Sequence, residues 1–364
     1  MRPRLGIPVI AALTVGVALL GVGCGGRETG APATSPPPPP PASTQPESAP
    51  SDRIDLGEAG YSIVWLDDDH LLVRDQDGFT SVDVNTHKKK TVFREAGGSR
   101  IESHAAVSPD GSRIAFTRHL TDQAPAVLQV LTLGEAEPKT IVPASEGPYG
   151  LDWPVWSPDG TLLTFLDWNL RMPYMVAADG TSERRALPPD FPAYEGTVVV
   201  DWSGDQILVA AASGNANGLF TAPVAGGPPV RIDASGDPEP PDGPSGLGFS
   251  PDGGKVAYTQ PDGGLWLAAS DASWRRRVNP KGTSVRGGRG AASFAPDGRL
   301  FFAADEGLWV ANEDGHHPRR ILESGCASAR VSPDGSKVAC YYSEEDEATG
   351  GHHAWAFIVE LTES

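Results

Sequence analysis

The chain has 364 residues and a formal net charge of −18, with 29 Lys and Arg against 47 Asp and Glu. A nucleic-acid binder normally carries a net basic domain or a dense basic face, so this balance argues against nucleic acid as a partner. Only three cysteines are present.

The first 23 residues predict the compartment. Arg2 and Arg4 precede an apolar run that continues to residue 23 and ends at Cys24, which is the layout of a secretory signal peptide. The Gly-Cys junction resembles a bacterial lipoprotein signal, and this resemblance implies that Cys24 is lipidated and becomes the new N-terminus. An uncleaved anchor and simple secretion are the alternatives. All three place the folded part outside the cytoplasm, and the first two attach it to the membrane.

A spacer is expected after the signal. Residues 24–51 are rich in Gly, Ser, Thr and Pro and include an unbroken proline run at 36–41. Such a composition cannot bury a core and favours a semi-extended tether. Residues 52–364 remain as one folded domain.

Seven repeats fill that domain. In each, an apolar run ends in a turn that resembles Ser-Pro-Asp-Gly, and a second apolar run follows. Clean copies of the turn begin at Ser108, Ser157, Ser250 and Ser332, a near copy at Ala295, and degraded copies at Leu66 and Ser203. The residues just before the turns, which recur every 37 to 49 positions, are Trp65, Val107, Trp156, Trp202, Phe249, Phe294 and Val331. A strand-based period of this size predicts a β-propeller with one blade per repeat.

The turn has a direct physical interpretation. Pro109 presets φ for the first corner of a type I turn, Asp110 suits the second corner, and Gly111 takes the left-handed position. We therefore expect a three-residue hairpin loop with a bulge in each blade.

Each repeat also contains a second pair of strands. Gly-Leu-Trp elements at 264–266 and 307–309 each lead to an Arg-rich segment, at 274–278 and 318–322. The repeat thus predicts four strands per blade, here called A to D. Basic residues on strand D fit an outer edge, where charge discourages pairing with other chains.

The whole pattern resembles the TolB-like, or PD40-type, propeller repeats. The resemblance covers residues 52–364 and rests on the aromatic-Ser-Pro-Asp-Gly turn and the Gly-aromatic third strand. It implies an all-β, seven-bladed β-propeller. The family includes TolB, a binding protein of the cell envelope, and the propeller halves of prolyl-oligopeptidase-type peptidases.

The last repeat predicts how the ring closes. It has room for strands near 327–331, 337–342 and 353–361 but not for a fourth, while residues 52–56 form an unassigned strand before the first repeat. We expect that N-terminal strand to complete the seventh blade. Cys326 and Cys340 lie on the first two strands of this blade, and they are expected either to form a disulfide or to remain two buried thiols.

In such rings the D–A and B–C loops gather on one face around the channel mouth, and loops commonly carry function. That face is rich in Trp, Tyr and Arg, the residues that dominate binding hot spots. The candidates for partner binding are Arg100, His104, Tyr149, Asp152, Trp153, Trp168, Arg171, Tyr194, Arg286 and Arg289. For Trp153 the alternative is simple packing between blades.

Motifs for catalysis were not found. The sequence has no Gly-x-Ser-x-Gly elbow and no zinc-spaced Cys or His pattern, so we expect no catalytic residues, metal or cofactor. The sequence favours a membrane-tethered extracytoplasmic propeller that binds an envelope protein or peptide. The alternatives are a propeller enzyme, such as a lyase or glycan-processing hydrolase with its site at the channel mouth, and a purely structural envelope component.

Overall fold

The computed structural model describes residues 53–58, 62–75, 78–95, 97, 99–121, 124–147, 149–187, 197–211, 218–233, 248–285, 290–305, 307–323, 325–345 and 352–361. Regular structure within these ranges consists of 28 β-strands and no helix. No described segment therefore forms a helix able to span a bilayer.

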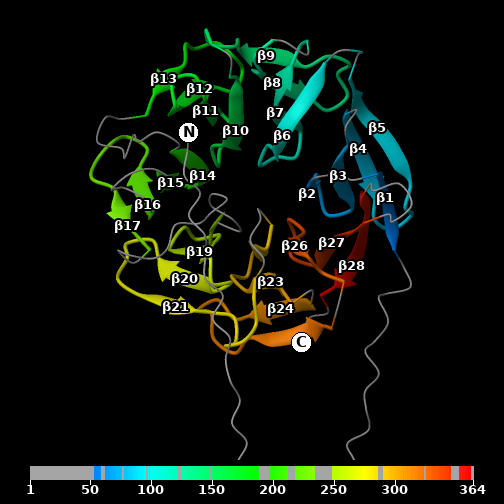
Figure 1. Cartoon of the computed structure of the whole chain (residues 1–364), viewed down its shortest axis with the longest axis vertical. Coiled ribbons are helices and arrows are strands. Elements are labelled where there is room, and N and C mark those ends of the chain that lie inside the picture. Colours follow the sequence, from blue (N-terminus) through cyan, green and yellow to red (C-terminus); the bar gives the residue numbers. More distant parts are fainter. Residues whose placement is uncertain are drawn as a thin grey trace, which may run out of the picture. The chain divides into compact units, whose positions relative to one another are not determined.

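The strands form seven antiparallel four-stranded sheets, arranged as the blades of one propeller around a central axis (Figure 1). Blades 1 to 3 comprise β2 (Ser62–Trp65), β3 (His70–Asp75), β4 (Gly78–Asp83), β5 (Lys89–Arg94); β6 (Arg100–Val107), β7 (Arg113–His119), β8 (Val127–Thr132), β9 (Lys139–Val142); and β10 (Leu151–Trp156), β11 (Leu162–Asp167), β12 (Met172–Ala177), β13 (Arg185–Ala186).

Blades 4 to 6 comprise β14 (Val198–Ser203), β15 (Gln206–Ala211), β16 (Gly218–Pro223), β17 (Val230–Arg231); β18 (Gly248–Phe249), β19 (Lys255–Thr259), β20 (Leu265–Ala269), β21 (Arg275–Arg277); and β22 (Ala292–Phe294), β23 (Leu300–Ala304), β24 (Gly307–Ala311), β25 (Arg319–Leu322). Blade 7 comprises β26 (Ser328–Val331), β27 (Lys337–Glu345), β28 (His352–Glu360) and β1 (Ile54–Glu58). The predicted seven-bladed, all-β fold is confirmed.

The N-terminal strand closes the ring as the sequence predicts. Strand β1 pairs antiparallel with β28, placing Ile54 opposite Ala356 and adding the outer strand of blade 7. Ile54 is buried, and Asp55 bonds His353 at 2.8 Å. Residues 298 positions apart are thus joined in one sheet.

The Ser-Pro-Asp-Gly turns are one residue longer than expected. The N–H of Ser108 donates to the carbonyl of Arg113 at 2.8 Å, so the loop of the clean copy spans residues 109–112. The Ser108 hydroxyl accepts the N–H of Arg113, and Asp110 accepts the N–H of Ser112. These side-chain bonds accommodate the extra residue. Gly111 has φ +70°, the left-handed conformation that the sequence predicts.

Arg side chains of the outer strands pack on aromatic rings of the third strands. Arg275 lies over the Trp266 ring at 4.9 Å, and Arg320 lies over Trp309 at 5.9 Å. Each pair joins strand C to strand D of one blade, which is a cation–π contact at the sheet edge. These Arg side chains therefore have a structural role.

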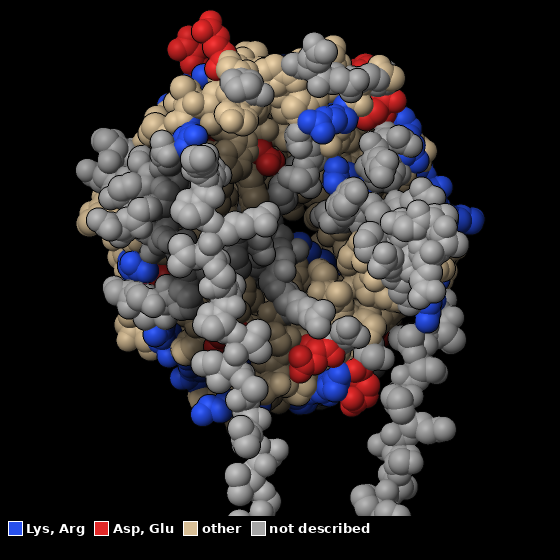
Figure 2. All heavy atoms as spheres, in the orientation of Figure 1, with Lys and Arg blue, Asp and Glu red and all other residues tan. Residues whose placement is uncertain are grey.

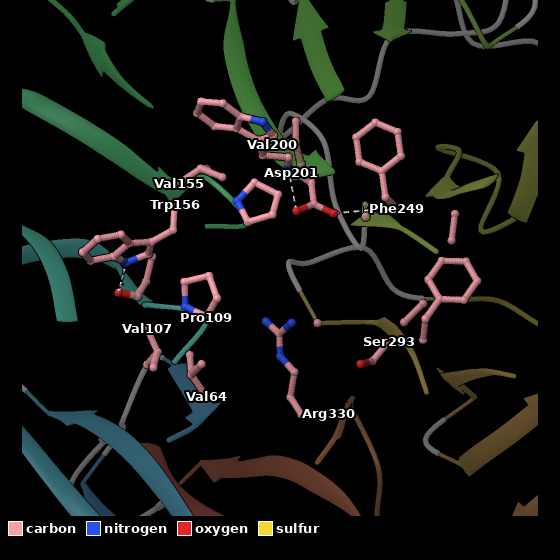
Figure 3. A pocket seen from close by; sticks show the side chains of 18 of the residues that line it. Val64, Val107, Pro109, Val155, Trp156, Val200, Asp201, Phe249, Ser293 and Arg330 are labelled. Carbon is pink, nitrogen blue, oxygen red and sulfur yellow. Dashed lines mark hydrogen bonds between the residues drawn. The ribbon is translucent and has the colours of Figure 1, made fainter. Parts of the chain in front are cut away.

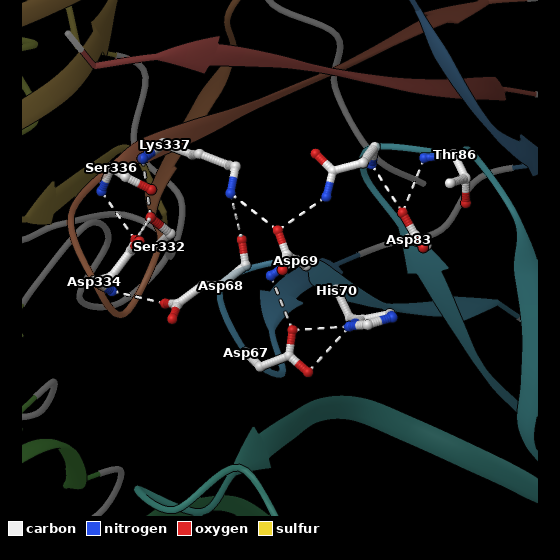
Figure 4. A network of polar contacts seen from close by, with 11 residues as sticks. Asp67, Asp68, Asp69, His70, Asp83, Thr86, Ser332, Asp334, Ser336 and Lys337 are labelled. Atoms are coloured by element: carbon white, nitrogen blue, oxygen red, sulfur yellow. Dashed lines mark hydrogen bonds and ion pairs between the residues drawn. The ribbon is translucent and has the colours of Figure 1, made fainter.

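Blades 1 and 7 are joined by a polar network at their turns (Figure 4). The N–H of Asp334 donates to Asp68, and the ammonium of Lys337 donates to the Asp68 carbonyl at 3.0 Å and to Asp69 at 3.1 Å. Burial alone would lower the pKa of Lys337, but the hydrogen bond and charge of Asp69 raise it. The degraded turn of blade 1 thus fastens the two ends of the ring. Blade 7 also contains the Cys326–Cys340 disulfide.

Candidate functional site

Exposed apolar side chains gather on the loops of blades 2 and 3. Among the described residues, five large apolar side chains are exposed, and four of them lie on these loops. Leu120 follows β7, Tyr149 precedes β10, and Trp168 and Leu170 follow β11. Their exposed fractions, in that order, are 47%, 58%, 40% and 47%. Large exposed apolar side chains gathered on one set of loops are a mark of an interaction surface. We call these four residues the blade 2–3 patch.

The loops that carry this patch are held together by hydrogen bonds. The Asn169 amide accepts the N–H of Tyr149 at 2.9 Å and donates to the Tyr149 carbonyl at 2.7 Å. The N–H of Trp168 donates to the Gly150 carbonyl, and the N–H of Leu151 donates to the Ala126 carbonyl in the neighbouring blade. The patch is therefore built on connected loops from two blades.

A buried carboxylate fixes the central loop of the patch. Asp167 is fully buried, and its oxygens accept hydrogen bonds from the Ser145 hydroxyl, the Asn169 N–H and the Arg184 guanidinium. The Arg184 bond is 2.7 Å long. Such a carboxylate has its partners within the protein, so it shapes the loop and is not offered to a ligand. Arg171 is exposed at the end of this loop with φ +54°.

The other described candidates have different surroundings. Arg100 is exposed and lies 3.2 Å from the His119 ring nitrogen at the start of blade 2. Asp152 accepts the N–H of Trp153 at the bulge between β10 and β11. Trp153 is half-buried and packs against the apolar cluster of blades 4 and 5. Of the described candidates, the structure brings only Tyr149, Trp168 and Arg171 together on the patch loops.

Several predicted positions lie outside what the structure describes. They are the signal and tether, including Cys24, the side chain of His104, and Tyr194, Arg286 and Arg289. Their roles stay predictions.

A second site lies where the seven inner strands meet. These strands enclose a central cavity of about 550 Å³, and every blade contributes to its wall. Figure 2 shows the hollow at the centre of the ring, with basic atoms inside it. Most of the lining side chains are apolar, Val64, Val107, Val155 and Phe249 among them, while polar atoms also contribute to the wall. We call this cavity the central channel.

Two charged side chains of opposite sign line the central channel (Figure 3). Asp201 accepts the N–H of Trp202 at 2.8 Å and the N–H of Phe249 at 2.7 Å, so its carboxylate joins the inner strands of blades 4 and 5. Arg330 extends its guanidinium into the cavity. Its Nε is inaccessible to solvent and has no hydrogen-bond partner. Burial lowers the pKa of Arg330, because desolvation penalises the charged form.

The sequence analysis did not single out Arg330. The available signal was positional: Arg330 directly precedes Val331, the residue before the turn, and the same position of the other six repeats holds Val64, Ala106, Val155, Asp201, Gly248 and Ser293. Within the described parts of the chain, no group of three or more His, Cys, Asp or Glu side chains is placed to hold a metal ion.

Solved structures of other proteins share the fold of this chain. No protein-family model matches the sequence, and neither does any curated protein. Among solved structures, a chain of the mitotic checkpoint complex aligns with a TM-score of 0.59 at 11% identity, over 93% of this chain and 99% of that chain. An oligogalacturonate lyase from Vibrio parahaemolyticus aligns with a TM-score of 0.56 at 12% identity, over 85% and 92%.

TolB structures are also among the matches. A putative TolB from Agrobacterium tumefaciens has a TM-score of 0.45 at 16% identity, over 84% of this chain and 91% of that chain. At 11% and 12% identity, the alignments with the checkpoint-complex chain and the lyase show the propeller fold alone.

Proposed function

We propose that this protein is an extracytoplasmic propeller that binds a protein or peptide partner through the blade 2–3 patch, without catalysis. The observation that carries the proposal is the gathering of Leu120, Tyr149, Trp168 and Leu170 on connected loops. Exposed Trp and Tyr on a fixed backbone bury a large area at a small cost in conformational entropy. The Arg171 guanidinium adds several N–H donors to the same loop.

The hydrogen bonds of Asp167 and Asn169 support this proposal. They fix the loops before a partner arrives, so less ordering entropy is lost on binding. A preformed patch of this kind suits a partner with an apolar segment. In the proposal, the signal layout places the patch outside the cytoplasm, and a lipid on Cys24 holds it at the membrane.

A paired-variant experiment tests the patch. The full chain is cross-linked in its own membranes, and the captured protein is identified by mass spectrometry and purified. Tyr149→Ala with Trp168→Ala should weaken binding of that protein about tenfold or more, because both side chains are hot-spot types. Val230→Ala removes the fifth exposed apolar side chain, on the outer strand of blade 4, and should leave binding unchanged. Equal affinity for the double variant and the parent would refute the patch.

The tether has its own test. Cys24→Ala should either release the protein from the membrane fraction or leave it unprocessed, since the lipid would have no attachment site. A variant that is processed and still fractionates with membranes like the parent would refute lipidation at Cys24.

A further inference from the structure

The central channel contains a cation that the fold does not satisfy. No ion pair or hydrogen bond of the Arg330 guanidinium exists among the described residues, and its Nε is buried without a partner. The Asp201 carboxylate in the same cavity is already held by two backbone N–H groups. A half-buried charge without a partner is costly, and such groups concentrate at functional sites.

The fold holds Arg330 in place through its backbone and its neighbours. The Arg330 carbonyl accepts the indole N–H of Trp65 at 2.8 Å. Gly290, on the adjacent blade, provides room for the side chain, because a Cβ atom there would lie 2.9 Å from the Arg330 Cζ. The Arg330 backbone is thus fixed, and the absence of a side chain at Gly290 leaves room for the guanidinium.

A second polar group lies beside it. Ser293, on β22, lines the same cavity, and its hydroxyl oxygen accepts the N–H of Val331 at 3.3 Å. This bond uses a lone pair and leaves the hydroxyl proton able to donate. Figure 3 shows Ser293 and Arg330 on the same side of the cavity.

We propose that the central channel binds a carboxylate with an apolar body, with Arg330 and Ser293 holding the carboxylate. The planar guanidinium matches a carboxylate through two parallel hydrogen bonds. Asp201 already brings one negative charge to this cavity, so a ligand with a single negative charge is favoured over a phosphate dianion, which would add two. The volume of about 550 Å³ falls in the range of small-ligand sites, and Val64, Val107, Val155 and Phe249 suit an apolar body.

The same chemistry occurs at a peptide C-terminus and in a free small acid, so the test uses both. Acetyl-Leu-Phe and 4-phenylbutyrate are each titrated into the full chain by calorimetry. The affinity of each acid is compared with that of its uncharged amide. The proposal expects at least one acid to bind at least tenfold more tightly than its amide. Binding of the dipeptide alone identifies a peptide terminus, and binding of phenylbutyrate alone identifies a small acid. Equal binding of acid and amide, or no binding of either acid at millimolar concentration, overturns the proposal.

Variants test whether the acid binds at Arg330 and Ser293. Arg330→Gln should weaken binding of the acid about tenfold or more, and Ser293→Ala should weaken it about threefold. Arg319→Gln, on the exposed outer strand β25, removes the same charge far from the cavity and should change nothing. Arg330→Gln should also melt at or above the temperature of the parent without ligand, because it removes an unpaired, half-buried charge. A parental affinity in Arg330→Gln would overturn the assignment.

Discussion

The indole N–H of Trp65 donates a 2.8 Å hydrogen bond to the carbonyl oxygen of Arg330, 265 residues away. The bond joins the inner strand of blade 1 to that of blade 7, where the two ends of the ring meet. Trp156 makes the same bond to the Ala106 carbonyl, from blade 3 to blade 2. The Trp residues before the turns therefore do more than fill space between blades.

Trp65→Phe tests this bond. The change keeps most of the buried ring but leaves the Arg330 carbonyl without its donor, so the free energy of unfolding should fall by about 1–3 kcal/mol. Denaturant unfolding measures the loss. Trp168→Phe, on an exposed loop, is the matched control and should have no effect. A parental stability for Trp65→Phe would show that the indole bond is dispensable.

Removal of β1 tests the closure. A chain that begins at Gly60 loses buried Ile54 and Leu56, each contributing about 1.5–3 kcal/mol, and exposes the edge of β28. Its melting temperature should drop by several degrees. A chain that begins at Ser51 keeps β1 and should melt like the parent. Equal melting of the two shortened chains would count against closure by β1.

Replacing the turn glycines with Val should lower stability by different amounts. Gly253 and Gly204 have φ +70° and +56°, so Val at either position is strained, at a cost of about 1–3 kcal/mol. At Gly253 a Cβ atom would also lie 2.7 Å from the Ser203 hydroxyl oxygen, whereas at Gly204 nothing lies within 4 Å. Gly253→Val should therefore destabilise more than Gly204→Val in thermal melts. The reverse order would contradict the packing of these turns.

The Ser-Pro-Asp-Gly turns predict a loss of stability in acid. The Ser108 hydroxyl and the Ser112 N–H lower the pKa of Asp110 to about 2, and Ser332 with Ser336 does the same for Asp334. Because the pKa in the unfolded chain is near 3.9, this stabilisation is complete above about pH 4. It is lost as the pH falls from about 4 to about 2.

Melting temperatures measured across this pH interval check the acid prediction. The double variant Asp110→Asn with Asp334→Asn cannot ionise at these positions. Its melting temperature should be lower than that of the parent at pH 6 and should decline less steeply toward pH 2. If the variant and the parent decline in parallel, the turn carboxylates are not the source of the acid sensitivity.

The sequence by itself determined the seven blades, the ends of six of the seven inner strands and the closing strand. These features depend on local chemistry that recurs: a turn that needs Pro, Asp and Gly, and apolar runs on either side of it. The loop length was wrong by one residue in the clean turns, because Ser108 and Asp110 bond the backbone through their side chains.

Only the tertiary structure decided which of these residues meet. Trp153 and Trp168 look alike in the sequence, yet one packs against a neighbouring blade and the other is exposed. Arg330 and Ser293 come from different blades, and their shared cavity exists only when seven inner strands surround one axis. The repeat indicates which position of each blade lines the channel, but the distances between those side chains depend on how the seven inner strands surround the axis.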